Sequence, residues 1–120
     1  MARPIIFFDI AGPDMAAQVK FYQSVFGWSL QDGAGDMQVM GPLPGRLDGG
    51  LRGDPTDSMI YFGVEDITAT LETVVAHGGA VVAPRFEAPG VVILGLFTDP
   101  AGNRMGLVEV EGERARVPEE

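Results

Sequence analysis

Apolar residues along the chain form two similar series, each a strand followed by a helix. Residues 4–10 and 59–64 are short runs rich in β-favouring side chains, as buried strands require. After each run, apolar positions are spaced by four, three and four residues, which predicts one apolar face on a helix. These positions are Met15, Val19, Tyr22 and Phe26 in the first series and Ile67, Leu71, Val74 and Gly78 in the second.

The two series are related by an offset of 52 residues. Asp14 and Asp66 each stand just before a helical stripe, where a carboxylate can accept a backbone N–H bond as an N-cap. Gly27 and the pair Gly78-Gly79 stand where the helices should end. A repeat of this length predicts a duplicated supersecondary unit.

Short apolar segments between Gly- and Pro-rich turns predict three further strands in each half. They are residues 28–31, 37–40 and 47–52, then 80–84, 91–97 and 104–110. We therefore expect an α+β fold of two βαβββ modules, residues 4–53 and 58–110, within one domain of residues 1–120. Residues 111–120 read as a polar, frayed tail.

Composition and charge exclude or disfavour several classes of partner and site. A net charge of −9 disfavours nucleic acid as a partner, because little offsets phosphate repulsion. The chain has no cysteine, which excludes disulfides, zinc–thiolate sites and cysteine nucleophiles. No apolar run approaches the roughly 20 residues that span a bilayer, and no leader opens the chain. We expect a soluble cytoplasmic protein without membrane partners.

Three segments resemble the vicinal oxygen chelate superfamily, which includes glyoxalase, bleomycin-resistance proteins and extradiol dioxygenases. Phe21-Tyr-Gln-Ser-Val-Phe-Gly-Trp28 resembles the end of the family's first helix. Tyr61-Phe-Gly-Val-Glu-Asp66 resembles the opening of its second module, and Thr98-Asp-Pro-Ala-Gly-Asn-Arg-Met-Gly106 its closing hairpin. The resemblance implies paired βαβββ modules whose mixed sheet curls around a cleft, and a homodimer.

The resemblance also assigns positions to the metal ligands of the family's enzymes. Here these positions hold Phe7, Met59 and Gly106, with the fourth near Gly50. Phe and Gly offer no donor, and Met offers only a thioether. A two-histidine, one-carboxylate iron site needs two histidines, whereas His77 is the only one and belongs to a helix end. We therefore expect no metal and no other cofactor; a carboxylate-only magnesium site is the alternative left open, although no Asp-x-Asp cluster supports it.

Strand alternation predicts which side chains meet a ligand. Ile6, Phe8 and Ile10 should lie under the first helix, and Leu96 should pair with Gly106 on the opposite face of the second module. The predicted ligand-binding set is Phe7, Asp9, Met59, Tyr61, Leu96, Gly106 and Val108. Such an apolar and aromatic lining suits a small organic ligand with few polar groups.

Asp9 is the one carboxylate in this set. It can act as a general base, pair with a cationic group of a ligand, form a structural salt bridge to Arg46, Arg52 or Arg104, or be exposed. Tyr61 can donate to a ligand or simply pack, and Trp28 can belong to a core or to a subunit interface.

Three functions remain open. The first is metal-independent binding of an apolar or aromatic molecule between the modules, as in bleomycin-resistance proteins. The second is a glyoxalase-like lyase or isomerase that lacks the usual metal site and uses Asp9 as its base. The third is an accessory module that pairs with another protein.

Overall fold

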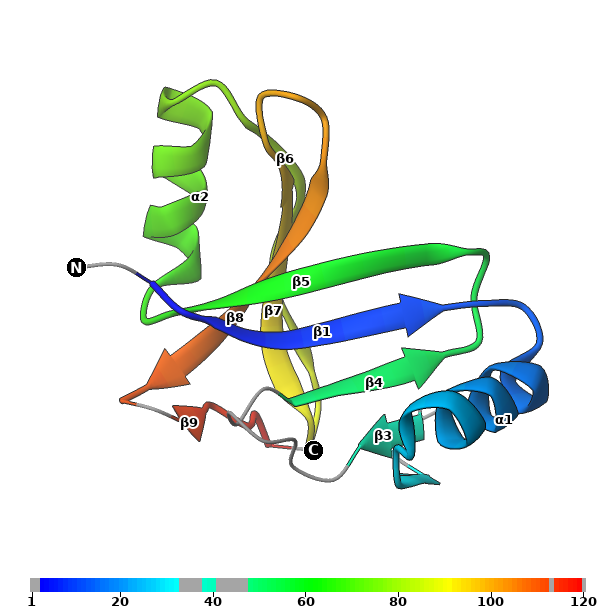
Figure 1. The fold of residues 1–120 in the computed structure, drawn as a ribbon. Helices are drawn as coiled ribbons and strands as arrows, with labels where there is room; N and C mark the ends of the chain where they lie inside the picture. Colours follow the sequence, from blue (N-terminus) through cyan, green and yellow to red (C-terminus); the bar gives the residue numbers. More distant parts are fainter. Residues whose placement is uncertain (1–2, 33–37, 41–47, 113, 120) are drawn as a thin grey trace. The chain divides into compact units, whose positions relative to one another are not determined.

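The computed structural model describes residues 3–32, 38–40, 48–112 and 114–119. They form eleven elements (Figure 1): β1 (Ile5–Ala11), α1 (Met15–Phe26), β2 (Leu30–Asp32), β3 (Gln38–Met40), β4 (Asp48–Arg52), β5 (Asp57–Val64), α2 (Ile67–Ala76), β6 (Ala80–Ala88), β7 (Val92–Thr98), β8 (Arg104–Glu111) and β9 (Arg114–Ala115). Two compact units contain them: unit 1 is residues 1–5 and 61–120, and unit 2 is residues 6–60.

Both helices begin where the sequence predicts, and α1 also ends there, whereas α2 ends at Ala76, with His77 as its C-cap, just before the predicted Gly78. The Asp14 carboxylate accepts a bond of 3.1 Å from the Ala17 N–H, and Asp66 accepts one of 2.9 Å from Ala69. Gly27 ends α1 in the left-handed conformation, at φ 67°, where a residue without Cβ is unstrained. The residues that make these capping contacts are close together in the sequence, and the sequence pattern alone therefore locates them.

The strand order repeats from one unit to the other. In unit 2 the order is β2-β3-β4-β1, and β1 runs parallel to β4. In unit 1 the order is β6-β7-β8-β5, and β5 runs parallel to β8. The α+β class and the two βαβββ modules are therefore confirmed.

The core of unit 1 lies between α2 and the sheet. Its buried members are Val64, Ile67, Leu71, Ile93 and Leu107, with Phe62 and Phe97 packed against them. Figure 1 shows α2 alongside the strands of this unit. The apolar stripe of α2 thus faces the sheet, as its spacing predicts.

In unit 2 the stripe of α1 packs differently. The helix contains no fully buried residue, and Phe26 is exposed. Tyr22 instead stacks on Trp28, with ring centroids 4.7 Å apart, and Trp28 lies 5.9 Å from Phe8. Trp28 is therefore half-buried in an aromatic cluster, and the contact with Phe8 places this ring on the helix side of β1, as predicted.

Two expectations are corrected. Strand β6 continues past Pro84 to Ala88. A proline is tolerated there because β6 lies at the edge of its sheet and its register with β7 shifts between Ala83 and Phe86. The tail is also not frayed throughout. Strand β9 pairs with β8, and Gly90 N–H donates to the Pro118 carbonyl over 2.9 Å.

None of the described helices is long and apolar enough to cross a membrane.

Candidate functional site

The strand register places four members of the predicted ligand-binding set on one face of unit 1. Tyr61 on β5 stands opposite Gly106 on β8, and Gly106 stands opposite Leu96 on β7. Val108 follows two residues later on the same face. The predicted pairing of Leu96 with Gly106 is therefore confirmed, whereas a role for these residues in binding stays a prediction.

The ring of Tyr61 lies directly over Gly106. A Cβ atom at position 106 would fall inside this ring. The lack of a side chain at Gly106 thus lets the Tyr61 ring approach the strand this closely. The same arrangement occurs in unit 2, where a Cβ at Gly49 would fall inside the ring of Phe8.

Asp9 forms a salt bridge within unit 2. Arg52 Nε lies 3.1 Å from Asp9 Oδ1, and the carboxylate-bearing residue is only 3% exposed. The same guanidinium reaches Asp54 at 3.0 Å and Asp57 at 3.3 Å. Of the alternatives open from the sequence, the structure contains the salt bridge to Arg52; Arg46 lies outside the described residues.

Most of the predicted ligand-binding set is buried. Met59 is 4% exposed, Tyr61 8% and Val108 4%, while Phe7 and Leu96 are half-buried. Of the predicted set, Phe7 and Leu96 are thus the members that expose the most surface to solvent.

Sequence reasoning missed a second buried carboxylate, Glu109 on β8. Arg85 on β6 holds it with two parallel bonds of 3.0 Å, and Arg116 from the tail adds a contact of 3.1 Å. Hydrogen bonds from Arg85, and then from Arg116, hold the pKa of Glu109 below its ordinary value, against the effect of burial. The available signal was a single charge inside the apolar run Leu107-Val-Glu-Val110.

The residues present do not fit the metal site that the family resemblance implies. Phe7, Met59 and Gly106 supply no oxygen or nitrogen side-chain donor, and the Tyr61 ring fills the space above Gly106. Among the described residues, no group of three or more His, Asp or Glu is arranged to hold a metal ion. His77 lies at the end of α2, with Nδ1 2.9 Å from the Thr73 carbonyl.

Solved structures share this fold. The methylmalonyl-CoA epimerase of Mycobacterium tuberculosis is similar with a TM-score of 0.67 and 16% identity, over 89% of this chain and 87% of that one.

Curated proteins share sequence as well. The protein CFP32 of Mycobacterium tuberculosis is 32% identical over 111 residues, which cover 82% of this chain and 42% of CFP32. The anthracycline biosynthesis protein DnrV of Streptomyces peucetius is 28% identical over 120 residues, with 79% and 42% covered. The chain thus spans less than half the length of the curated relatives that it matches.

A family model covers nearly all of both modules. The model of the glyoxalase/bleomycin resistance protein/dioxygenase superfamily matches residues 5–107. This range includes all three segments that carry the resemblance in the sequence, and it agrees with the repeated strand order. The chain therefore belongs to the glyoxalase/bleomycin resistance protein/dioxygenase superfamily.

Proposed function

We propose that this protein binds a small apolar or aromatic organic molecule without a metal ion. The observation that carries the proposal is the pair formed by Tyr61 and Gly106. The family's enzymes carry a ligating glutamate at the position of Gly106, whereas here an aromatic ring covers a residue without a side chain. The chemistry offered at this position is a flat apolar surface rather than a charged ligand.

The remaining members of the predicted ligand-binding set support the same chemistry. Leu96 on β7 is half-buried and Val108 on β8 is buried, and both lie on the same face of unit 1 as Tyr61. The relative DnrV is named as an anthracycline biosynthesis protein. A ligand of this kind would pack against Tyr61 and Leu96 on this face of unit 1.

Metal content tests the first half of the proposal. Protein purified without a histidine tag should contain well below one transition-metal ion per chain by plasma mass spectrometry, because the implied positions lack donors. Addition of Zn²⁺, Mn²⁺ or Fe²⁺ should leave the melting temperature unchanged. One tightly bound ion per chain would overturn the metal-independent proposal.

A thermal-shift screen of planar aromatic compounds tests the second half. Binding should raise the melting temperature, since a ligand that binds only the folded state stabilises it. Tyr61→Ala should change the affinity of any hit, and Val117→Ala, at an exposed tail position, serves as its control. If the compounds bind the Tyr61→Ala variant with the same affinity as the wild type, Tyr61 does not belong to the proposed site.

A second candidate function is a lyase or isomerase with Asp9 as general base. It is kept because a protein similar in fold is a methylmalonyl-CoA epimerase. The salt bridge to Arg52 disfavours it, because the charge of Asp9 is already matched by a guanidinium. Exchange of the C2 hydrogen of methylmalonyl-CoA in D₂O, present in the wild type and abolished in Asp9→Asn, would restore the enzymatic candidate.

A further inference from the structure

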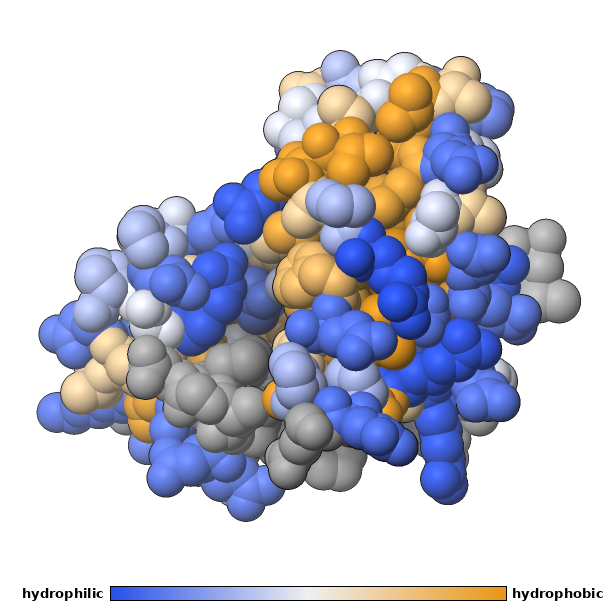
Figure 2. All heavy atoms as spheres, turned by 180° about the vertical axis from the view of Figure 1, so that it is seen from behind, coloured by the Kyte–Doolittle hydropathy of each residue, from blue (hydrophilic) through white to orange (hydrophobic). Residues whose placement is uncertain are grey.

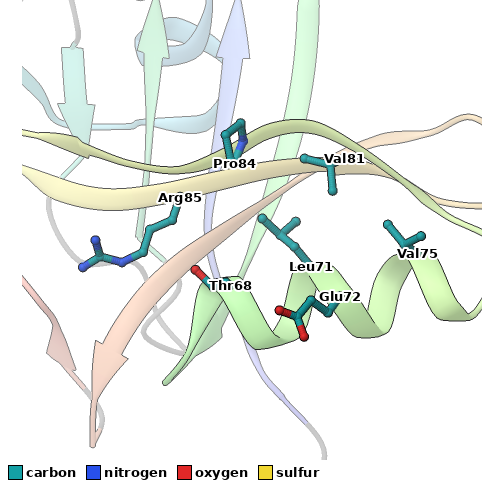
Figure 3. A pocket seen from close by; sticks show the side chains of 7 residues that line it. All are labelled: Thr68, Leu71, Glu72, Val75, Val81, Pro84 and Arg85. Atoms are coloured by element: carbon teal, nitrogen blue, oxygen red, sulfur yellow. The ribbon is translucent and has the colours of Figure 1, made fainter.

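A hollow of about 390 Å³ lies between α2 and β6, within unit 1. Its lining is Thr68, Leu71, Glu72, Val75, Val81, Pro84 and Arg85. The four positions on α2 follow the spacing of one helix face, and Figure 3 shows Thr68 and Arg85 at one end of the hollow and Val75 at the other. The volume lies at the small end of the range of ligand pockets.

Apolar side chains make up most of this surface. Leu71 is buried, whereas Val75 is 54% and Val81 42% exposed. Val82 and Phe86 continue the exposed apolar residues along β6. Figure 2 shows hydrophobic side chains gathered over the part of the molecule that holds α2 and β6. An apolar surface of this kind in contact with water favours an apolar ligand.

Of the two charged side chains that line the hollow, Arg85 is already paired within the protein, and Glu72 is not paired among the described residues. The guanidinium of Arg85 is already engaged, because it makes two bonds of 3.0 Å to Glu109 and lies 3.8 Å from Glu87. The Glu72 carboxylate, by contrast, makes no ion pair or hydrogen bond with any side chain in the described part of the chain. The charge left to a ligand is therefore negative, and the Thr68 hydroxyl adds a neutral acceptor.

We propose that this hollow is a second ligand site, which takes small organic cations. The apolar body of the ligand packs on Leu71, Val75 and Val81, and its ammonium group pairs with Glu72. The site is separate from the proposed aromatic site, since α2 covers the face of the sheet opposite to Tyr61 and Gly106. The net charge of −9 favours the approach of a cation at low salt.

Three probes of the same shape test the proposal: 4-tert-butylbenzylammonium, 4-tert-butylbenzyl alcohol and 4-tert-butylbenzoate. Each is titrated into ¹⁵N-labelled protein, and amide shifts give both the location and the dissociation constant. We expect shifts in α2 and β6, with the ammonium bound most tightly and the benzoate most weakly. Shifts confined to other elements, or equal affinity for the ammonium and the alcohol, would overturn the proposal.

Two variants separate the charge from the apolar surface. Glu72→Gln should weaken the ammonium roughly two- to fivefold, as expected for an exposed ion pair, and leave the alcohol unchanged. Val75→Ser should weaken the ammonium and the alcohol alike. Both positions face solvent at least in part, so the spectrum of the folded protein should be retained.

The matched control is Glu65→Gln, which removes the same charge from an exposed residue outside the hollow. It should leave the affinity for the ammonium within error of the wild type. If Glu65→Gln weakens the ammonium as much as Glu72→Gln does, the attraction comes from net charge alone and the site is not specific for a cation.

Discussion

Asp9 and Glu109 are buried carboxylates that arginines hold, one in each unit. Asp9 is 3% exposed and pairs with Arg52, and Glu109 is 4% exposed and pairs with Arg85 and Arg116. A buried charge is tolerated only when partners compensate its desolvation. At the scale of single residues, the two acids therefore belong first to the stability of their units.

Removing Arg52 should cost more than removing Asp9. Arg52→Met leaves the buried carboxylate without this guanidinium, at a cost of about 3 kcal/mol or more in the free energy of unfolding. Asp9→Asn leaves Arg52 in contact with Asp54 and Asp57, and should cost about 1 kcal/mol. Urea denaturation measures both.

Asp54→Asn is the control, because Asp54 is exposed and its pair with Arg52 should contribute little. A larger loss in Asp9→Asn than in Arg52→Met would contradict the assignment of Arg52 as the partner that Asp9 requires.

Glu109 should make the free energy of unfolding depend on pH in the acidic range. Its pKa in the folded protein lies below the ordinary value of 4.5, mainly because of the bonds from Arg85. The contribution of this carboxylate to stability is thus complete above pH 4.5 and is lost as the pH falls through the lowered pKa. Glu109→Gln should cost about 1–3 kcal/mol near pH 7.

The difference in melting temperature between the wild type and Glu109→Gln should therefore shrink as the pH falls from 6 to 3. Glu119→Gln, at an exposed residue of the tail, provides the comparison. A difference that stays constant over this range would show that Glu109 has the same pKa in the folded and unfolded chains.

At the scale of elements, close packing on two strands depends on glycine. Tyr61 lies over Gly106 between β5 and β8, and Phe8 lies over Gly49 between β1 and β4. The sequence places both glycines in strands, although glycine has a low β-propensity. The neighbouring aromatic ring, which is tens of residues away along the chain, explains why glycine occupies each position.

Gly106→Ala should destabilise the protein by about 1–3 kcal/mol, because the new methyl group and the Tyr61 ring compete for the same space. In a Tyr61→Leu background the same change should cost less, and a double-mutant cycle measured by urea denaturation gives the coupling. Gly53→Ala, where the nearest atom is Met15 Cε at 3.9 Å, should be close to neutral. Additive effects of Tyr61→Leu and Gly106→Ala would contradict the packing argument.

At the scale of the whole molecule, the two units repeat one strand order, and the chain belongs to the glyoxalase/bleomycin resistance protein/dioxygenase superfamily. We propose, from the family resemblance, that the chain forms a homodimer. Several exposed apolar residues, Phe21, Val25 and Phe26 on α1 among them, are consistent with a surface that another chain covers.

Light scattering coupled to size-exclusion chromatography checks this prediction. The expected mass is about twice the 12.7 kDa of one chain, and it should persist on dilution into the low micromolar range. A mass of one chain at every concentration would contradict the homodimer.

The sequence by itself determined the elements and their order. Helix caps at Asp14 and Asp66, the end of α1 at Gly27, the end of α2 just before Gly78, and the alternation that pairs Leu96 with Gly106 all depend on contacts close in sequence or on a fixed period. The motifs near Tyr22, Asp66 and Asp99 then indicated the family. Pattern and motif together therefore fixed the fold class.

Only the tertiary structure decided which charges and rings meet. Sequence left Arg46, Arg52 and Arg104 open as partners of Asp9, and it gave no sign that Arg85 reaches Glu109 across 24 residues. The docking of Arg116 and the stacking of Tyr61 on Gly106 were equally hidden. Such contacts depend on strand register and burial, which join distant residues and leave no periodic signal along the chain.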